Sequence, residues 1–223
     1  YDLHLSYSLE IVEELKAQFG VKSAWLPFAH HLDDQVYEEV LSRGKSEIRE
    51  ACFVGNPDPW RVKVIGDLVA AGLTVNLFGF GWSRHFAHTP RAVIHQPRKA
   101  LSYWSEPSEF WQVLRQYRLQ LNFFRPHNEG SHNLRTFEVP AVGGILLSPD
   151  SKEQRQFFEE EKEIFYWNSP RHLVEQSHKL LAMAETDVAV VRDRARLRSI
   201  ISDYSYSART RQMLQIIQKN LFQ

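Results

Sequence analysis

The sequence of 223 residues contains one cysteine, Cys52. A single cysteine excludes a framework of intramolecular disulfides. Cys52 lies in the apolar run ACFVG, which favours a buried strand residue over a reactive nucleophile. Low cysteine content fits a reducing compartment, so we expect a cytoplasmic protein.

Neither positive nor negative charge is in excess in the sequence, and no long hydrophobic run is present. Its 27 Lys and Arg residues balance 27 Asp and Glu residues, which excludes the strongly basic surface of a nucleic-acid-binding protein. No apolar run approaches the roughly 18 residues needed to span a bilayer, and the amino terminus lacks a signal-peptide pattern. We therefore expect no nucleic-acid partner, no transmembrane segment, and only local anion sites.

Several catalytic and metal-binding patterns are missing as well. The ten histidines include no pair with helical zinc spacing and a carboxylate partner. Asp33 and Asp34 are adjacent, which is more typical of a helix start than of a metal site. No Walker-type phosphate loop and no Ser-His-Asp order appears. These absences predict that the protein has no metal site. They also argue against a hydrolase or an NTPase, because the residues that those functions need are missing.

What the sequence does contain is an alternation of short apolar strands with helices. The pattern predicts helices at 9–19, 60–71, 108–117 and after Pro170, and strands at 3–6, 23–27, 51–54, 74–78, 92–95, 119–123, 145–148 and 164–167. Strands of this kind form a parallel sheet covered on both faces, so we expect a doubly wound, Rossmann-like α/β fold. The last third, from His172, is predicted to be a helical tail of two helices split near 203–205.

Composition divides the chain into three parts. Residues 1–31 form one βαβ unit by pattern, and residues 32–50 are polar and predict a connector with one short helix. Residues 51–223 carry the main fold and the closing helices. Because the strand pattern is already present at Tyr1, we expect another domain to precede this chain.

Three loops follow predicted strands and should meet at one edge of the sheet. The first holds Gly55 and Asn56, the second runs from Gly79 through Gly81 to Trp82, and the third spans 125–133. Glycine lets the backbone approach a diphosphate closely, and Arg61 begins the helix after the first loop, where it could neutralise that charge. The alternative is a tight turn with a solvated arginine. Trp82 could stack on a base or sugar, or serve as a packing anchor.

The third loop leads into the stretch EGSHNLRTFEVPAVGGILLS at 129–148. If 134–141 form a helix, residues 130–133 present free backbone N–H groups at its positive end. Arg135 could add a guanidinium for phosphate, and Glu138 could accept two ribose hydroxyl groups. The alternative is an ordinary capped helix, with Arg135 and Glu138 in a solvated ion pair and a glycine pair ending the helix.

The segment LRTFEVPAVGG at 134–144 resembles the donor-site motif of GT-B-fold glycosyltransferases, and in particular of CgeB-like members. FVGNPDPWR, GFGW and DYSYSARTRQMLQII resemble other parts of that family's carboxyl-terminal domain. The resemblance implies that Glu138 holds the ribose of a sugar nucleotide. The common pattern has seven residues between two glutamates, whereas Glu129 and Glu138 have eight between them, so the role of Glu129 does not carry over.

The resemblance also implies a set of ligand-binding residues. The predicted donor-binding residues are Gly55, Asn56, Arg61, Gly79, Gly81, Trp82, Arg125, Ser131, Asn133, Leu134, Arg135, Thr136 and Glu138. Arg135 and His127 are the candidates for a part in catalysis, and the catalytic base is expected from the other domain. The donor substrate is a nucleotide-diphosphate sugar such as a UDP or GDP sugar, and no further cofactor is required.

The sequence therefore predicts the donor-binding half of a glycosyltransferase whose acceptor is unknown: a glycan, a protein or a small molecule. One alternative is a non-catalytic module that binds a nucleotide sugar or a partner protein. Another is a sugar-nucleotide epimerase or hydrolase on the same fold.

Overall fold

The computed structural model describes residues 2–95, 107–125 and 128–222. The main body is a six-stranded sheet in the order β5-β4-β3-β6-β7-β8, with every pairing parallel. Its strands are β3 (Ile48–Val54), β4 (Val75–Phe78), β5 (Ala92–His95), β6 (Tyr117–Leu121), β7 (Leu146–Pro149) and β8 (Phe165–Trp167). The chain first adds β4 and β5 on one side of β3, and then β6, β7 and β8 on the other side. This arrangement confirms the predicted doubly wound fold.

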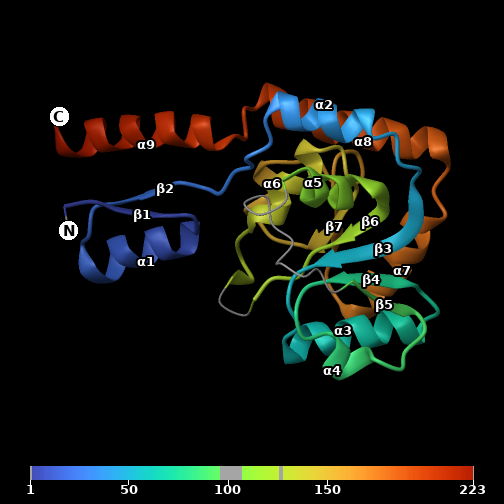
Figure 1. Cartoon of the computed structure of the whole chain (residues 1–223). Helices are drawn as coiled ribbons and strands as arrows, with labels where there is room; N and C mark the ends of the chain where they lie inside the picture. The colour runs from blue at the N-terminus through green and yellow to red at the C-terminus, as the bar shows by residue number, and fades with distance from the viewer. Residues whose placement is uncertain (1, 96–106, 126–127, 223) are drawn as a thin grey trace.

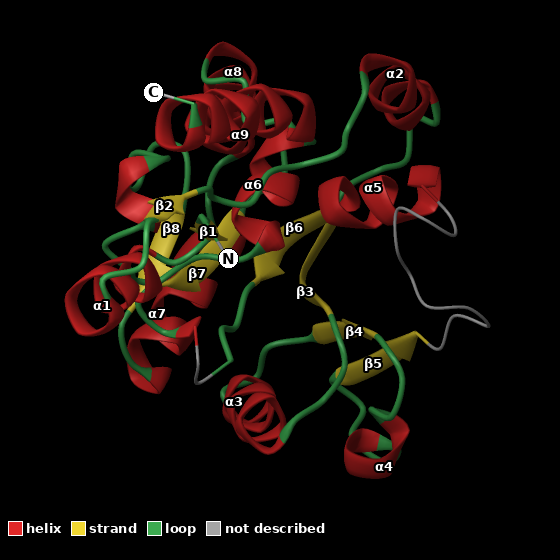
Figure 2. Ribbon diagram, turned by 90° about the vertical axis from the view of Figure 1, so that its left-hand side faces the viewer, coloured by secondary structure: helices red, strands yellow, loops and turns green. Residues whose placement is uncertain are grey.

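Helices cover both faces of this sheet (Figure 2). One face carries α3 (Pro59–Ala70), α4 (Ser83–Phe86) and α7 (Pro170–Leu181), and the other carries α5 (Pro107–Gln116) and α6 (Leu134–Ala141). Helix α2 (Asp34–Ser42) packs against α5, and α8 (Glu185–Ile201) packs against α6 while Val188 and Val191 join the core on the α3 and α7 side.

Alternation along β3 shows how the sequence divides between the two cores. Ala51 and Phe53 pack with α3 and α7, whereas Cys52 and Val54 pack with α5 and α6. Successive strand residues point to opposite faces, so a strand buried on both sides reads as a continuous apolar run. Cys52 is completely buried, and burial raises the pKa of its thiol, as the strand assignment from sequence implied.

The amino-terminal unit, residues 2–25, is separate from this sheet. Strands β1 (His4–Ser6) and β2 (Ser23–Trp25) pair in parallel across α1 (Leu9–Phe19). The carboxyl-terminal helix α9 (Tyr206–Leu221) extends from the main body alongside this unit (Figure 1), and Lys22 Nζ donates to the Asn220 carbonyl at 3.2 Å. The two ends of the chain are therefore neighbours.

Local capping explains the best-predicted helix boundaries. Helix α1 begins after Ser8, whose side chain accepts from Ile11 N–H, and ends at Gly20 in the left-handed conformation. Helix α7 begins with Pro170 after the capping residue Ser169.

Two boundaries differ from the expectations. Strand β3 already begins at Ile48, inside the segment expected to be a connector. Its first three residues are not fully buried and include the charged Arg49 and Glu50. The helical tail contains three helices, because a break at 182–184 separates α7 from α8. That break has no glycine or proline to reveal it, whereas the predicted break at 203–205 is confirmed and includes Asp203 at φ 46°.

Candidate functional site

The sheet order places the carboxyl ends of β3 and β6 side by side. Helices α3 and α6, which follow these strands, lie on opposite faces of the sheet. In open α/β sheets a crevice forms where the connections diverge in this way, and ligands bind there. The loops after β3, β4 and β6 therefore form the edge of the candidate site.

The loops after β3 and β4 are joined directly. The indole N–H of Trp82 donates to the Gly55 carbonyl at 2.8 Å, and Phe80 N–H donates to Asn56 Oδ1 at 3.0 Å. A Cβ on Gly79 would lie 2.3 Å from the Gly55 carbonyl oxygen, and one on Gly81 would lie 3.3 Å from Pro57. The predicted convergence of these loops is present, and their glycines let the two backbones pack together.

Replacing Gly79 with alanine is expected to lower the free energy of unfolding by about 2 kcal/mol or more, because the new methyl group meets backbone atoms that cannot move aside. Gly66→Ala is the control, since a Cβ there meets nothing within 4 Å. We expect Gly66→Ala to stabilise helix α3 by about 0.5–1 kcal/mol. Chemical denaturation measures both, and equal stability of the two variants would contradict the close packing.

Arg61 ties the β3 loop to the β6 loop. Its Nη1 donates to the Asn56 carbonyl at 3.0 Å and its Nη2 to the Phe123 carbonyl at 3.4 Å. Asp58 pairs with Arg61 Nε at 3.2 Å and also caps α3. Burial lowers the pKa of Arg61, and the nearby positive charges of Arg125 and Arg135 lower it further. The three guanidinium groups therefore lie close enough to repel one another, which favours an anion among them.

Arg135 and Glu138 form an ion pair at the start of α6. Arg135 Nη2 also donates to the Val54 carbonyl at 3.3 Å, and its guanidinium lies over the Phe110 ring at 5.0 Å. The Glu138 side chain is only 2% exposed. Burial raises the pKa of the Glu138 carboxyl, and Arg135 opposes that rise. The pairing considered from sequence is present, but the Glu138 carboxylate is buried rather than solvated.

The amino-terminal end of α6 adds backbone donors to this charge cluster. Helix α6 spans Leu134–Ala141, the predicted range. Within the described part of the chain, no carbonyl accepts from the N–H groups of Leu134 or Arg135. Free N–H groups at a helix start attract anions. We call Arg61, Arg125, Arg135 and Glu138, with this helix start, the arginine cluster.

Several residues predicted to contact the donor have other partners. Trp82 is completely buried and packs against Phe53 and Phe86, so it is the packing anchor considered from sequence rather than a stacking surface. The Ser131 hydroxyl donates to Glu153 at 2.7 Å, and the Thr136 hydroxyl donates to Gln154 at 2.9 Å.

The remaining predicted residues differ in what they can offer a ligand. The Asn133 side-chain amide pairs with the amide of Asn122 at 2.8 Å and 3.1 Å, so it holds the loop against the end of β6. Leu134 offers only its backbone N–H. Arg125 is exposed at the edge of the crevice, whereas His127 lies outside the described residues.

A buried polar group beneath the loop before α6 was missed from sequence. Glu153 accepts from His132 Nδ1 at 2.7 Å and from Leu9 N–H, the first residue of α1, at 2.7 Å. His132 Nε2 accepts from Phe28 N–H at 3.1 Å. Desolvation lowers the pKa of His132, which keeps the ring neutral and able to accept that bond. The amino-terminal unit is thus bonded to the loop of the candidate site, and no local pattern around Glu153 signals this.

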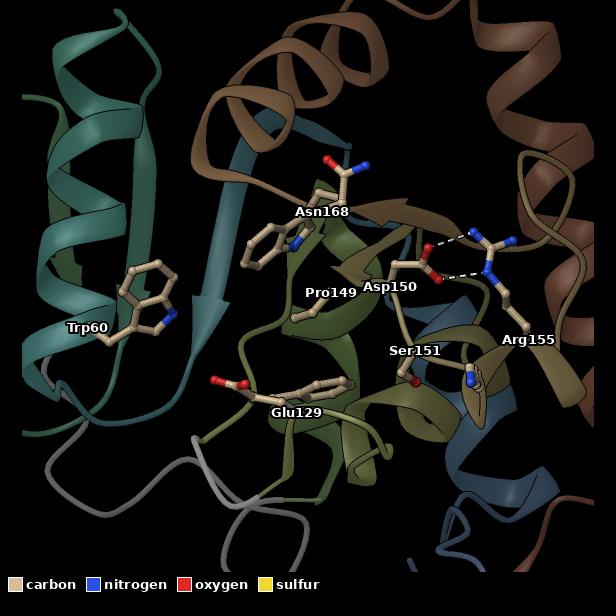
Figure 3. A pocket seen from close by; sticks show the side chains of 10 residues that line it. Trp60, Glu129, Pro149, Asp150, Ser151, Arg155 and Asn168 are labelled. Atoms are coloured by element: carbon tan, nitrogen blue, oxygen red, sulfur yellow. Dashed lines mark hydrogen bonds and ion pairs between the residues drawn. The ribbon is translucent and has the colours of Figure 1, made fainter. Parts of the chain in front are cut away.

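Next to the arginine cluster lies a cavity of about 700 Å³ (Figure 3). Its residues come from α3 and from the chain just after β6, β7 and β8: Trp60, Phe124, Glu129, Pro149, Asp150, Ser151, Lys152, Arg155, Trp167 and Asn168. Of these residues, only Glu129 was a candidate site residue from the sequence. The loops after β7 and β8 have no glycine signal, although their position after parallel strands could have indicated them.

Among residues 2–95, 107–125 and 128–222, no group of three or more His, Cys, Asp or Glu side chains is arranged to hold a metal ion. No helix in those ranges is long and apolar enough to cross a membrane.

The sheet order and the charged residues at its switch point define a doubly wound, Rossmann-like α/β domain. A family model described as glycosyl transferase-like matches residues 60–215, more than half of the chain. The protein belongs to this glycosyl transferase-like family. Comparison with curated proteins gives no match.

Solved structures share the fold at low sequence identity. Anabaena HepE in complex with UDP-glucose is 13% identical, with a TM-score of 0.67, over 98% of this chain and 64% of that one. Sucrose-phosphate synthase from Thermosynechococcus elongatus is 14% identical, with a TM-score of 0.66, over 98% of this chain and 58% of that one.

An α,α-trehalose-phosphate synthase (UDP-forming) from Burkholderia vietnamiensis is 10% identical, with a TM-score of 0.68, over 100% of this chain and 60% of that one. The chain thus spans about three fifths of the length of these structures.

Proposed function

We propose that this chain is the donor-binding part of a glycosyltransferase that uses a nucleotide-diphosphate sugar. The observation that carries this proposal is the arginine cluster at the switch point, where Arg61 lies near Arg125 and Arg135, and Arg135 pairs with the buried carboxylate of Glu138. Arginine groups and free N–H donors suit a diphosphate, and a carboxylate suits the two hydroxyl groups of a ribose. The glycosyltransferase family and a UDP-glucose complex of HepE support this choice of ligand.

In the proposed reaction, the bond between the sugar's anomeric carbon and the diphosphate oxygen breaks, and an acceptor hydroxyl oxygen bonds to that carbon. The hydroxyl proton goes to a base, which the resemblance places in the other domain. Negative charge develops on the departing diphosphate, where Arg61, Arg125 and Arg135 are positioned to stabilise it. The amino-terminal unit is proposed as the end of that acceptor domain, with residues 51–223 as the donor domain.

Calorimetry with UDP, GDP, UDP-glucose and GDP-mannose tests donor binding directly. Arg125→Ala is the most informative variant, because Arg125 is exposed and its removal should leave the fold intact. Loss of a charge-assisted hydrogen bond is expected to weaken binding of the preferred nucleotide about 10- to 100-fold.

Arg43→Ala is the matched control, since Arg43 ends α2 and pairs with Glu39, away from the crevice. We expect this variant to bind as tightly as the unchanged chain. Failure of the unchanged protein to bind any of the four nucleotides, or equal binding by both variants, would contradict the proposed donor site.

A further inference from the structure

The cavity beside the arginine cluster differs from the cluster in its charge. Its charged side chains are Glu129, Asp150, Lys152 and Arg155, two negative and two positive. Arg155 pairs with Asp150 through two hydrogen bonds of 2.7 Å and 2.8 Å (Figure 3) and with Glu160 at 2.7 Å, so neither Asp150 nor Arg155 is an unpaired charge. A wall with balanced charge favours an uncharged ligand, because an unpaired ionic ligand would lose hydration without a counter-charge. The cavity therefore suits a different ligand from the anion expected at the arginines.

Aromatic side chains form the apolar part of the same wall. Trp60 is 41% exposed at the start of α3 and faces the cavity in Figure 3, whereas Phe124 and Trp167 are largely buried. A tryptophan left this exposed beside a cavity is a candidate contact surface, since large apolar side chains are usually covered. Aromatic rings can pack against the C–H face of a sugar ring.

Polar groups are distributed around these rings. Asp150 and Glu129 accept hydrogen bonds, Lys152 and Arg155 donate them, and the amide of Asn168 does both. A hydroxyl group is itself both a donor and an acceptor, so a ligand with many hydroxyl groups can use all of these partners. The ligand that matches flat apolar contacts, a polar rim and no net charge is a saccharide. The volume of about 700 Å³ lies within the range of pockets that enclose whole small molecules.

We propose that this cavity, whose residues all lie within 51–223, is the donor domain's share of the acceptor site and binds a saccharide there, separately from the nucleotide sugar. This inference deepens the proposed function, on which it rests, by naming the class of acceptor. The chain itself places the two ligands side by side: Trp60 precedes Arg61, and Phe124 precedes Arg125. Each pair of neighbours contributes one residue to the cavity and one to the arginine cluster. A saccharide in the cavity would thus lie next to the proposed diphosphate.

Saturation-transfer NMR on the full chain tests this assignment with glucose, galactose, mannose, N-acetylglucosamine, maltose and lactose at millimolar concentration. We expect at least one of these sugars to bind and Trp60→Ala to weaken that binding about tenfold or more. Trp60→Phe should retain most of it, because it keeps an aromatic ring. Asp150→Asn should also weaken binding, since it removes one of the two carboxylate charges that hold Arg155 in place.

Phe19→Ala is the matched control, because Phe19 is 70% exposed on the amino-terminal unit. It should change nothing, and thermal denaturation should show that every variant is folded. Absence of binding by all six sugars would overturn the proposal, as would binding that Trp60→Ala and Asp150→Asn leave unchanged.

Two further arms separate this proposal from the donor assignment. If UDP fails to bind but sugars bind in a Trp60-dependent way, the donor proposal fails and the saccharide cavity stands. If no free sugar binds while Trp60→Ala weakens UDP-glucose but not UDP, the cavity holds the donor's own sugar and the acceptor assignment is overturned.

Discussion

Replacing Arg135 with alanine is expected to slow sugar transfer by about 10²- to 10³-fold, the cost of removing one donor that stabilises developing charge. The Val54 carbonyl anchors Arg135 Nη2, so the guanidinium stays in place when a nucleotide replaces its contact with Glu138. A group held in this way stabilises the departing diphosphate without reorganising. Its removal should therefore lower turnover more than nucleotide affinity. Release of UDP or GDP from the donor identified by calorimetry measures the rate, in a protein that joins this chain to the domain proposed to supply the base.

The fold must be controlled in this experiment, because Arg135→Ala leaves the buried Glu138 carboxylate without a counter-charge. Breaking such a pair costs about 3–5 kcal/mol. The double variant Arg135→Ala/Glu138→Gln removes both charges and should recover much of that stability without recovering turnover. Arg135→Lys keeps the charge but not the planar fork, so its turnover should lie between that of the unchanged protein and that of Arg135→Ala. Unchanged transfer by a folded Arg135→Ala protein would refute this role.

The second large effect is expected at Glu153. Glu153→Ala removes the acceptor for Leu9 N–H, His132 Nδ1 and the Ser131 hydroxyl, and we expect the free energy of unfolding to fall by about 3 kcal/mol. Because Leu9 begins α1, this loss should appear first in the amino-terminal unit. Hydrogen exchange should show faster exchange over 4–25 than over the six-stranded sheet.

Glu175→Ala is the corresponding control, since Glu175 is exposed and pairs with Arg171 one helical turn away. Such surface pairs contribute about 0.5 kcal/mol or less. If Glu153→Ala were no more destabilising than Glu175→Ala, or if exchange rose uniformly over the chain, Glu153 would not attach the amino-terminal unit to the site loop.

The parts of the fold predicted well from sequence are those set by local signals. Helix α1 ends at Gly20 and helix α7 begins at Pro170, and each follows from the conformational preference of that one residue. The meeting of the loops at Gly55 and Gly79 followed from the parallel sheet, because carboxyl ends of parallel strands share an edge.

What sequence did not reveal depends on partners far away along the chain. Trp82 is buried because the Gly55 carbonyl accepts from its indole, and nothing in GFGW distinguishes that from an exposed ring. Glu153 receives its partners from Leu9 and His132, on separate segments. The cavity was missed because Asp150 and Asn168 follow strands without any glycine motif.

The buried pair of Arg135 and Glu138 also bears on which phosphates the proposed site would accept. Inorganic phosphate or diphosphate could take over Arg135, but it would leave Glu138 buried with no hydroxyl to replace its lost partner. A nucleotide offers both replacements at once, with phosphate for the guanidinium and ribose for the carboxylate. Binding would then exchange the internal Arg135–Glu138 contact for two contacts with the nucleotide, so that free phosphate competes poorly with the sugar nucleotide.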